Sequence, residues 1–271
     1  MFKKRKSSDD LLFNIQKVYG PYIVNCSKKV DFLINIFQRN DYSFLEKNKN
    51  HYLFIFEREK KKINVANYVS IRQLNYIIIQ ILIELLAKNG FFFHGSVVVN
   101  KKNEAFIFTG TSGSGKTTIS ELVSKNFIKI ADDSFFIKAE DNDYFVYTNP
   151  DDFSNKAEYD SKLYSIINKK FSIKGIFFLK KASYNKISKI NLSINLVKKI
   201  LRQVAINENY KKLHFSFLIR FIKKNLKKIY YLYFLNNDTI IKFIEKINQQ
   251  DFESQPLGTV HFQQESGVYI H

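Results

Sequence analysis

The sequence lacks the features that are typical of several protein classes. It contains one cysteine, Cys26, which excludes an internal disulfide framework and fits a reducing compartment. The longest apolar stretch, residues 76–87, is too short to span a bilayer and carries Gln80 and Glu84, so no membrane span is expected and a buried helix is predicted there. Ser7 to Asp10 stand where a signal peptide needs apolar residues, so we expect a cytoplasmic protein.

Acidic residues are scarce relative to basic ones. The chain has 25 Asp and Glu against 43 Lys and Arg, and a net charge of +18. Positive surface potential attracts phosphate polymers and acidic proteins. The lysines are spread along nearly the whole chain and form no single patch, so we do not expect nucleic acid as the main ligand, and an acidic peptide or protein is favoured over it. With 45% hydrophobic and 16% aromatic residues, the 271-residue chain is globular and long enough to bury a substantial core.

Glycine is also scarce, yet three of the nine glycines fall between positions 110 and 115. The stretch around them, here named the glycine-rich loop, follows the pattern G-x-x-x-x-G-K-[ST]. Its residues are Gly110, Thr111, Ser112, Gly113, Ser114, Gly115, Lys116, Thr117 and Thr118. Small side chains at these positions let consecutive backbone N–H groups surround a polyphosphate, so the pattern predicts a nucleotide-binding loop.

The flanks of the loop agree with this interpretation. An apolar run over residues 105–109 is typical of a buried strand, and apolar residues recur at helical spacing over 119–123. A helix that begins at the loop points its positive dipole end at bound phosphates. Lys116 is expected to reach the β- and γ-phosphates as a point charge, and the hydroxyl of Thr117 to bind a Mg²⁺ that bridges them. ATP and Mg²⁺ are therefore the expected ligands.

A pair of carboxylates follows the next predicted strand. Residues 127–131 are typical of a short strand, and Asp132 and Asp133 come directly after it. Adjacent carboxylates repel each other unless a cation, or a proton to be moved, lies between them and the phosphates. One of the two can hold the metal together with Thr117, and the other can act as a base toward an incoming hydroxyl. A solvated Asp-Asp turn is the alternative, and the sequence does not assign the two roles.

A histidine interrupts the strand-like stretch before the loop. The apolar run over residues 91–99 is broken at His94 and Gly95 and is followed by a polar turn over 100–104. A hairpin here would return His94 to the end of the sheet where the glycine-rich loop lies, and Gly95 would let another backbone or a ligand come close. His94 is then either a structural histidine bonded to backbone groups or a contact to phosphate or to the metal shell.

These stretches, in this order and at this spacing, resemble the catalytic core of HPr kinase/phosphorylase. They resemble still more closely the small HPr-kinase-like serine kinases, and ATP-dependent phosphoenolpyruvate carboxykinase has a similar loop and Asp pair. The resemblance implies an α/β fold with a P-loop kinase core over residues 69–250, and a homo-oligomer as one option. It implies an active site built from four side chains, those of His94, Lys116, Asp132 and Asp133.

The remaining chain predicts further α/β alternation. A small strand-rich module is predicted over residues 1–68 and a tail over 251–271. Predicted strands lie at residues 22–24, 32–34, 52–56, 135–137, 145–147, 173–179 and 229–235. Predicted helices lie at residues 69–88, 194–204, 210–227 and 238–249. The charged face of the helix predicted over 194–204 is either a solvent face or a source of one more phosphate contact, for which Arg202 is favoured because a guanidinium pairs bidentately with phosphate oxygens. The polar stretch over 149–162 is favoured as a solvated loop, with an acceptor site lined by its charged residues as the alternative.

The favoured function is an ATP- and Mg²⁺-dependent kinase that transfers the γ-phosphate to a hydroxyl of a peptide, a protein or a small molecule, with serine favoured. The alternative is a nucleotide-gated regulatory protein that hydrolyses ATP slowly. A third hypothesis, a nucleic-acid-binding ATPase, rests on charge alone. Steeply salt-dependent binding to single-stranded nucleic acid would support it. The sequence does not identify the acceptor.

Overall fold

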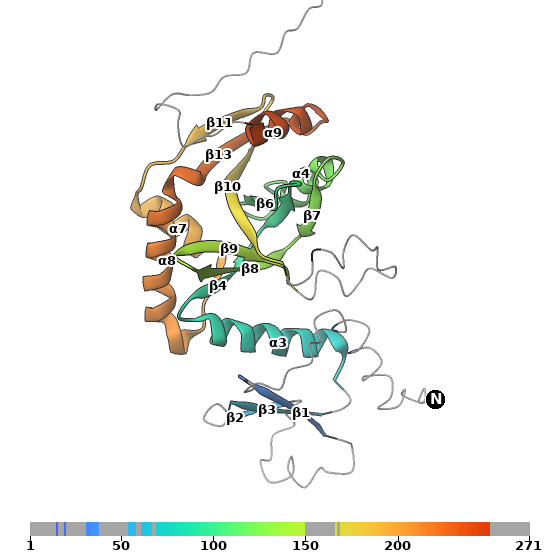
Figure 1. Ribbon diagram of the computed structural model, residues 1–271, viewed down its shortest axis with the longest axis vertical. Helices are drawn as coiled ribbons and strands as arrows, with labels where there is room; N and C mark the ends of the chain where they lie inside the picture. Colours follow the sequence, from blue (N-terminus) through green and yellow to red (C-terminus); the bar gives the residue numbers. More distant parts are fainter. Residues whose placement is uncertain are drawn as a thin grey trace, which may run out of the picture. The chain divides into compact units, whose positions relative to one another are not determined.

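The structure is a computed structural model that describes residues 15, 19, 31–37, 54–57, 61–66, 69–149, 166 and 169–249 (Figure 1). The chain divides into two compact units, one made of Met1–Leu82 with Phe153–Ile167 and the other of Ile83–Asp152 with Asn168–His271. The predicted strand at 22–24 and the predicted tail at 251–271 lie outside the described residues. No helix in the described part of the chain is long and apolar enough to cross a membrane.

The first unit contains a small mixed sheet. Its strands are β1 (Leu33–Phe37), β2 (Phe54–Glu57) and β3 (Lys62–Ala66). β3 lies in the middle, parallel to β1 and antiparallel to β2. Ile63 and Val65 of β3 are fully buried and belong to one apolar cluster with Val69, Ile77 and Ile81. The strands predicted at 32–34 and 52–56 are therefore confirmed with shifts of up to three residues at their ends, whereas β3 was not predicted.

Helix α3 (Ile71–Leu86) begins with a capping box. The backbone N–H of Gln73 donates to Ser70 Oγ at 3.3 Å, and the backbone N–H of Ser70 donates to Gln73 Oε1 at 2.8 Å, so two N–H groups at the helix start are satisfied. The prediction of a buried helix is right for one face only. Ile77 is fully buried, but Tyr76 is 57% exposed. Apolar residues occur all around this helix, and only one of its faces is buried.

The second unit is built on one large mixed sheet. Its strands are β4 (Gly90–His94), β5 (Ser96–Val99), β6 (Glu104–Thr109), β7 (Ile128–Ala131), β8 (Ser134–Glu140), β9 (Asp143–Tyr147), β10 (Phe171–Lys181), β11 (Lys186–Lys189), β12 (Val204–Ala205) and β13 (Ile229–Phe234). The main path runs β12-β4-β8-β9-β10-β6-β5-β7, and β13 pairs with both β10 and β11. The sheet therefore branches at the long strand β10, which pairs with β9 near its start and with β13 farther along.

Three parallel strands set the position of the site. β6 and β13 both run parallel to β10, so the carboxyl ends of these three strands meet at one edge of the sheet. Helices α4 (Lys116–Val123) and α9 (Thr239–Gln249) contribute to the apolar cluster on one face of these strands. Fully buried members of this cluster include Phe106, Phe108, Ile119, Ile240 and Ile244. Burying each such side chain contributes roughly 1.5–3 kcal/mol, so the strand ends are held on a well-packed base.

Two helices, α7 (Ile194–Leu201) and α8 (Lys211–Asn225), complete the second unit. The predicted helix over 194–204 is too long, because the chain leaves the helix after Leu201 and Val204 pairs with Phe93 as part of β12. The prediction extended too far because Val204 is apolar and lies at helical spacing from the apolar residues of α7. The predicted helix over 210–227 and the strands predicted at 135–137, 145–147, 173–179 and 229–235 are confirmed with small shifts at their ends.

A buried histidine lies on α8. The side chain of His214 is 1% exposed, and neither ring nitrogen has a hydrogen-bond partner among the described residues. Burial lowers the pKa of this imidazole below its ordinary value, because desolvation disfavours the charged form. The folded protein therefore holds His214 neutral where an unfolded chain would protonate it.

Acidification is expected to destabilise the fold through His214. Below the ordinary imidazole pKa of 6.5, the unfolded chain binds a proton that the folded chain does not. The free energy of unfolding then falls, by at most about 1.4 kcal/mol per pH unit, until the pH reaches the lowered pKa of the folded state. Denaturant titrations at pH about 8 to about 5 measure this slope in the wild type and in His214→Phe. An equal slope in both proteins would contradict the assignment.

Candidate functional site

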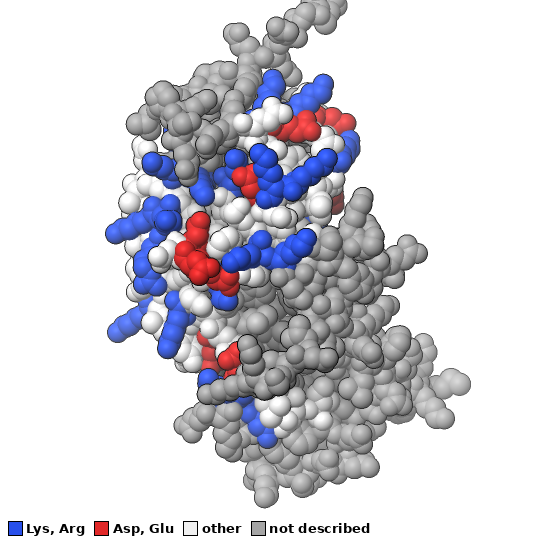
Figure 2. Space-filling model, in the orientation of Figure 1, with Lys and Arg blue, Asp and Glu red and all other residues white. Residues whose placement is uncertain are grey.

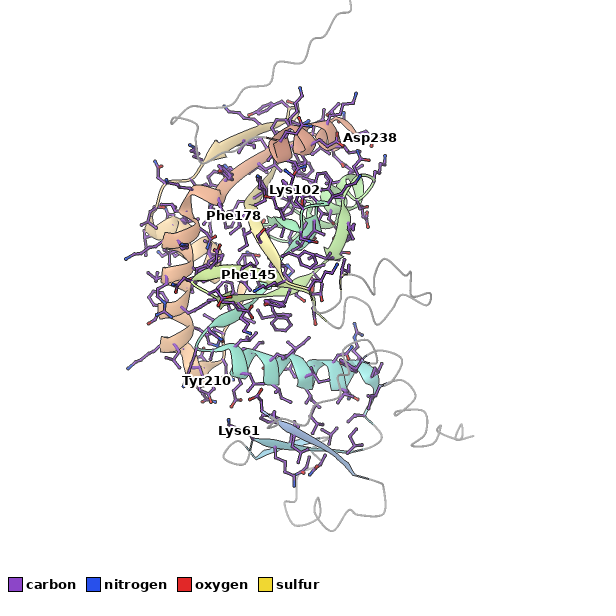
Figure 3. The ribbon with its side chains drawn as sticks, viewed as in Figure 1. Lys61, Lys102, Phe145, Phe178, Tyr210 and Asp238 are labelled. Carbon is purple, nitrogen blue, oxygen red and sulfur yellow. The ribbon has the colours of Figure 1, made fainter. Side chains whose placement is uncertain are left out.

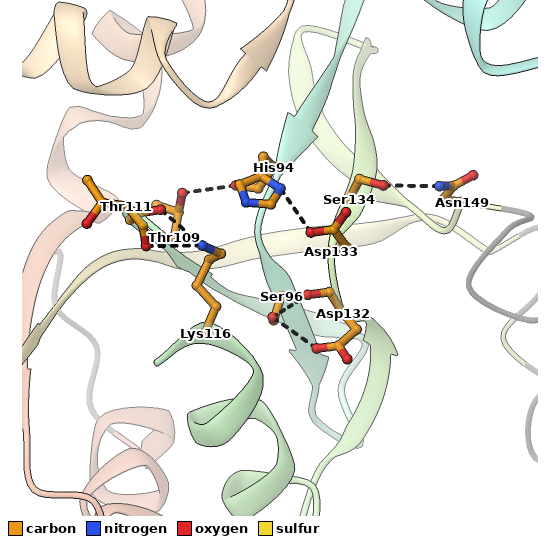
Figure 4. A network of polar contacts seen from close by, with 10 residues as sticks. His94, Ser96, Thr109, Thr111, Lys116, Asp132, Asp133, Ser134 and Asn149 are labelled. Atoms are coloured by element: carbon orange, nitrogen blue, oxygen red, sulfur yellow. Dashed lines mark hydrogen bonds and ion pairs between the residues drawn. The ribbon is translucent and has the colours of Figure 1, made fainter. Parts of the chain in front are cut away.

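The glycine-rich loop lies at the edge of the sheet where β6 ends. Thr109, the last residue of β6, pairs with Phe178 of β10, and the loop starts at the next residue. Helix α4 begins at Lys116. The predicted order of strand, loop and helix is therefore confirmed, and the start of α4 faces the strand ends (Figure 4).

Two glycines of this loop cannot be replaced without strain. Gly115 has φ of 97°, and a Cβ added there would lie 2.6 Å from the Cζ atom of Phe234. Gly113 has φ of 76°. L-residues with a side chain rarely adopt such φ values, and glycine does so at no steric cost. Gly115 thus allows the loop backbone to lie against the end of β13, and Gly113 allows the loop to turn.

Lys116 places a cation at the mouth of the loop. Its Nζ donates to the carbonyl oxygens of Gly110 at 3.1 Å and Thr111 at 3.3 Å (Figure 4). No carboxylate lies within ion-pair distance of this ammonium among the described residues. Inside the loop, Ser114 Oγ is buried and has no hydrogen-bond partner in the described part of the chain. An ammonium without a carboxylate partner among the described residues suits an anionic, oxygen-rich ligand.

His94 is held at the end of β4 by three contacts. Its backbone N–H donates to the carbonyl of Gln203 at 2.7 Å, and its own carbonyl accepts from Thr109 Oγ1 at 3.0 Å. The ring Nδ1 lies 3.2 Å from Asp133 Oδ1. β5 pairs antiparallel with β6, so the predicted hairpin is confirmed, and a Cβ at Gly95 would come within 2.8 Å of the carbonyl oxygen of Phe108. The close approach expected at Gly95 is thus to another backbone.

The two neighbouring aspartates have different surroundings. They form the turn between β7 and β8. Asp132 Oδ1 lies 3.0 Å from Lys129 Nζ, and Ser96 Oγ donates to the Asp132 main-chain carbonyl at 2.6 Å (Figure 4). The carboxylate of Asp133 is 82% exposed and contacts His94. Asp132 is therefore fixed by a cation and a hydroxyl, whereas Asp133 remains open to an approaching ligand.

A cavity of about 390 Å³ lies between these groups. Nine of the predicted site residues line it, namely His94, Ser112, Gly113, Gly115, Lys116, Thr117, Thr118, Asp132 and Asp133. The other three loop residues, Gly110, Thr111 and Ser114, are not among its lining residues. The volume lies within the usual range for small-molecule sites, so a nucleoside triphosphate has room to place its phosphates there.

Sequence reasoning missed one lining residue, Lys181. It is the last residue of β10, and because β10 runs parallel to β6 its end reaches the same edge of the sheet as the glycine-rich loop. The available signal was a lysine just after the strand predicted at 173–179; if that strand runs parallel to the one before the loop, the topology rule for such sheets places its end near the loop. Arg202, the predicted additional phosphate contact, is not among the lining residues, although the neighbouring Gln203 bonds to the His94 backbone.

The donor set at the cavity suits a hard divalent cation. In the described part of the chain, no group of three or more His, Cys, Asp or Glu residues could hold a metal ion. Mg²⁺, however, commonly uses one or two carboxylates together with substrate phosphates and water. Thr117, Asp132 and Asp133 all line the cavity and offer oxygen atoms only. These residues fit a Mg²⁺ that arrives with a nucleotide.

Most of the predicted acceptor stretch, residues 150–162, lies outside the described residues. Its first residue, Asn149, is described, and the side-chain amide of Asn149 donates to Ser134 Oγ at 3.1 Å (Figure 4). Ser134 directly follows the aspartate pair. The assignment of this stretch to acceptor binding stays a prediction.

The sequence model of one protein family, described as "SynChlorMet cassette protein ScmC", matches residues 58–249. No curated protein matches the chain significantly. Among solved structures, the Hpr(Ser) kinase/phosphatase from Coxiella burnetii is similar at 15% sequence identity and a TM-score of 0.27, over 49% of this chain and 97% of that chain. A likeness with so low a TM-score carries no weight for the fold or the activity of this protein.

Proposed function

From the cavity of this chain, which belongs to the SynChlorMet cassette protein ScmC family, we propose an ATP- and Mg²⁺-dependent kinase that transfers the γ-phosphate to a hydroxyl group. The observation that carries the proposal is one cavity with the glycine-rich loop and two lysines on one side and a pair of carboxylates beside a histidine on the other. Phosphoryl transfer needs positive charge on the phosphates, a bridging metal and an acceptor for the hydroxyl proton. The cavity residues provide a candidate for each of these needs.

The loop and the lysines would bind the phosphates. The ammonium groups of Lys116 and Lys181 would pair with phosphate oxygens, and the N-terminus of α4 would add its positive dipole end. Thr117 and Asp132 would hold Mg²⁺, which when bound would neutralise negative charge on the phosphates. Asp132 is suited to this role because Lys129 and Ser96 already fix its position.

Asp133 is the proposed base. Its exposed carboxylate would take the proton of the acceptor hydroxyl while the acceptor oxygen forms a bond to the γ-phosphorus and the bond from that phosphorus to the β-phosphate oxygen breaks. The products are the phosphorylated acceptor and ADP. His94, whose ring Nδ1 lies 3.2 Å from Asp133 Oδ1, would orient the carboxylate by a hydrogen bond.

A labelling experiment tests the proposal. The purified protein is incubated with γ-labelled ATP and Mg²⁺, with free serine or with Ser-containing peptides, and the position of the label is followed. Label on an acceptor hydroxyl that requires Lys116 is the expected result. Slow release of free phosphate with no labelled acceptor would instead support a nucleotide-gated regulatory protein. Absence of any Lys116-dependent turnover would overturn both.

Lys181→Ala is expected to slow phosphate transfer by about 10- to 100-fold. The expected loss is that of one charge-assisted hydrogen bond to a phosphate, about 1.5–3 kcal/mol. Steady-state kinetics with ATP measure it, and Lys181→Arg should retain a larger part of the activity than Lys181→Ala. Lys224→Ala, which removes an exposed lysine of α8, is the matched control. Equal rates for Lys181→Ala and Lys224→Ala would remove Lys181 from the site.

A further inference from the structure

A second functional candidate lies on the opposite face of β10 and β13. Along β13, Tyr230, Leu232 and Phe234 point into the apolar core, so the alternate residues Tyr231 and Tyr233 point away from it. In the register of the sheet, Lys180 of β10 and Lys186 of β11 lie directly beside Tyr233. Together these residues form a surface, here named the tyrosine–lysine surface. Its members are Lys180, Tyr184, Lys186, Lys199, Tyr231 and Tyr233.

Aromatic rings and ammonium groups alternate on this surface. Lys180 Nζ lies 4.2 Å from the ring centroid of Tyr231 and 4.9 Å from that of Tyr233, and it donates to the Tyr233 hydroxyl at 3.1 Å. Lys199 Nζ, from α7, lies 4.5 Å from the Tyr231 centroid and bonds to the hydroxyl of that residue. Phe178, labelled in Figure 3, supports Tyr231 from the same strand face with ring centroids 6.4 Å apart. The ammonium groups of Lys180 and Lys199 are therefore held in place without a ligand.

The turn that carries Tyr184 is also fixed. The side chain of Asn185 accepts from the Leu235 backbone at 2.8 Å and donates to Thr239 Oγ1 at 2.9 Å. These two bonds tie the turn between β10 and β11 to the chain that follows β13. The ring of Tyr184 stacks on that of Tyr233 with centroids 6.1 Å apart, and yet the residue remains 52% exposed. A large aromatic side chain is thus presented to solvent on an ordered turn.

The positive charge of this surface is not compensated within the described part of the chain. Lys180, Lys186 and Lys199 have no carboxylate within 4.0 Å there, in contrast to Lys125, Lys129 and other lysines that form ion pairs. Figure 2 likewise shows Lys and Arg over much of the described part of one face of the molecule, with Asp and Glu in smaller groups. Two ammonium groups gathered around one Tyr231 ring repel each other, and an anion that binds both would relieve the repulsion.

The tyrosine–lysine surface adjoins the cavity across the end of β10. Lys180 and Lys181 are consecutive, so they point to opposite faces of the strand, and Lys181 lines the cavity. In the register with β13, they pair with Tyr233 and Phe234 respectively. Phe234 packs against the glycine-rich loop at Gly115. A chain bound to the surface has only to pass the end of β10 to bring a hydroxyl to the cavity.

We propose that the tyrosine–lysine surface binds an acidic peptide segment of the hydroxyl acceptor. The inference rests on the proposed kinase function and adds to it the chemistry of the acceptor. Carboxylates of the peptide would pair with the ammonium groups of Lys180, Lys186 and Lys199, which have hydrogen atoms left to donate, and the exposed ring of Tyr184 would pack against an apolar side chain of the peptide.

The ring geometry favours a peptide over a nucleic acid. Single-stranded nucleic acids bind by stacking bases on open aromatic faces. Here the ring of Tyr231 is approached by two ammonium groups, and that of Tyr233 by Lys180 and by Tyr184. The covered faces of these two rings cannot accept bases, whereas the ammonium groups above them remain available to carboxylates, and the exposed ring of Tyr184 is the reason an oligonucleotide probe is included in the test.

Fluorescence anisotropy with the full chain and no nucleotide tests the surface separately from the chemistry. The probes are a labelled Ser-containing peptide rich in Glu, the same peptide with each Glu replaced by Gln, and a labelled oligothymidylate. The wild type is expected to bind the Glu peptide most tightly, and Lys180→Ala/Lys199→Ala to bind it about tenfold more weakly. Lys223→Ala/Lys224→Ala, which removes the same charge from α8, is expected to bind like the wild type.

Several outcomes would overturn this inference. Equal binding of the Glu and Gln peptides, or equal losses in both double variants, would show that the surface does not recognise carboxylates. Tighter binding of the oligothymidylate that Lys180→Ala/Lys199→Ala abolishes would assign the surface to nucleic acid. Lys180→Arg/Lys199→Arg should retain binding, which separates loss of charge from loss of fold. Transfer of the label from γ-labelled ATP to free serine is measured in parallel, so a failure of the kinase proposal is seen independently of peptide binding.

Discussion

Lys116→Ala is expected to lower the ATP turnover of the purified protein by about a hundredfold to a thousandfold, as loss of a preorganised charge at a transferring group does in other enzymes. The ammonium of Lys116 contacts only two carbonyls of its own loop, at 3.1 and 3.3 Å, among the described residues. Its loss therefore removes charge from the cavity without opening the core. The thermal unfolding temperature should stay close to that of the wild type.

The matched control for this variant is Lys125→Ala. Lys125 lies just after α4, and its ammonium pairs with Asp238 at 2.9 Å, away from the cavity lining. Its removal deletes the same charge from the same segment and is expected to leave turnover nearly unchanged. Turnover by Lys116→Ala at the wild-type rate would refute the assignment of the glycine-rich loop to nucleotide phosphates.

Asp133→Asn and Asp132→Asn are each expected to reduce phosphate transfer by about 10²- to 10⁴-fold, for different reasons. Asp133 is the exposed carboxylate beside His94, and an amide in its place cannot accept the hydroxyl proton. Asp132 is fixed by Lys129 and Ser96, and an amide there would weaken the bond to the metal. Raising the Mg²⁺ concentration should therefore restore part of the activity of Asp132→Asn and none of that of Asp133→Asn.

Transfer rates across a range of Mg²⁺ concentrations separate the two roles. Asp141→Asn is a suitable control, because Asp141 is an exposed turn residue with φ of 50°, a conformation that Asn tolerates. Rescue of Asp133→Asn by Mg²⁺, with no rescue of Asp132→Asn, would show that Asp133 holds the metal and Asp132 is the base. Normal transfer by both variants would show that the carboxylate pair is a solvated turn.

The local parts of the site could be predicted from the sequence because their signals are local. The loop pattern, the apolar run before it and the helical spacing after it lie within one short stretch, and the structure has β6, the loop and α4 in that order. The hairpin that returns His94 to the loop was also predictable, since a polar turn separates two apolar runs. The aspartate pair follows β7 as expected. His94, the aspartate pair and all but three residues of the glycine-rich loop line one cavity.

The rest depends on contacts between distant segments. Lys181 follows the loop by more than sixty residues, and only the parallel pairing of β10 with β6 brings it to the cavity. β11 has the sequence KISK, whose lysines are typical of an exposed edge strand and give little apolar signal. Val204 continued the helical spacing of α7, but its pairing with Phe93 places it in a strand. The alternation of Tyr231 and Tyr233 was visible in the sequence, but the face to which they point was not.

Equilibrium binding of Mg²⁺-ATP to the wild type and to Lys116→Ala tests the central claim most directly, because it requires neither an acceptor nor turnover. If the glycine-rich loop holds the phosphates, binding to the wild type is saturable, ADP and inorganic triphosphate compete with ATP, adenosine does not, and Lys116→Ala binds at least about tenfold more weakly. Equal affinity of the two proteins for ATP, or competition by adenosine as strong as that by ADP, would contradict the account.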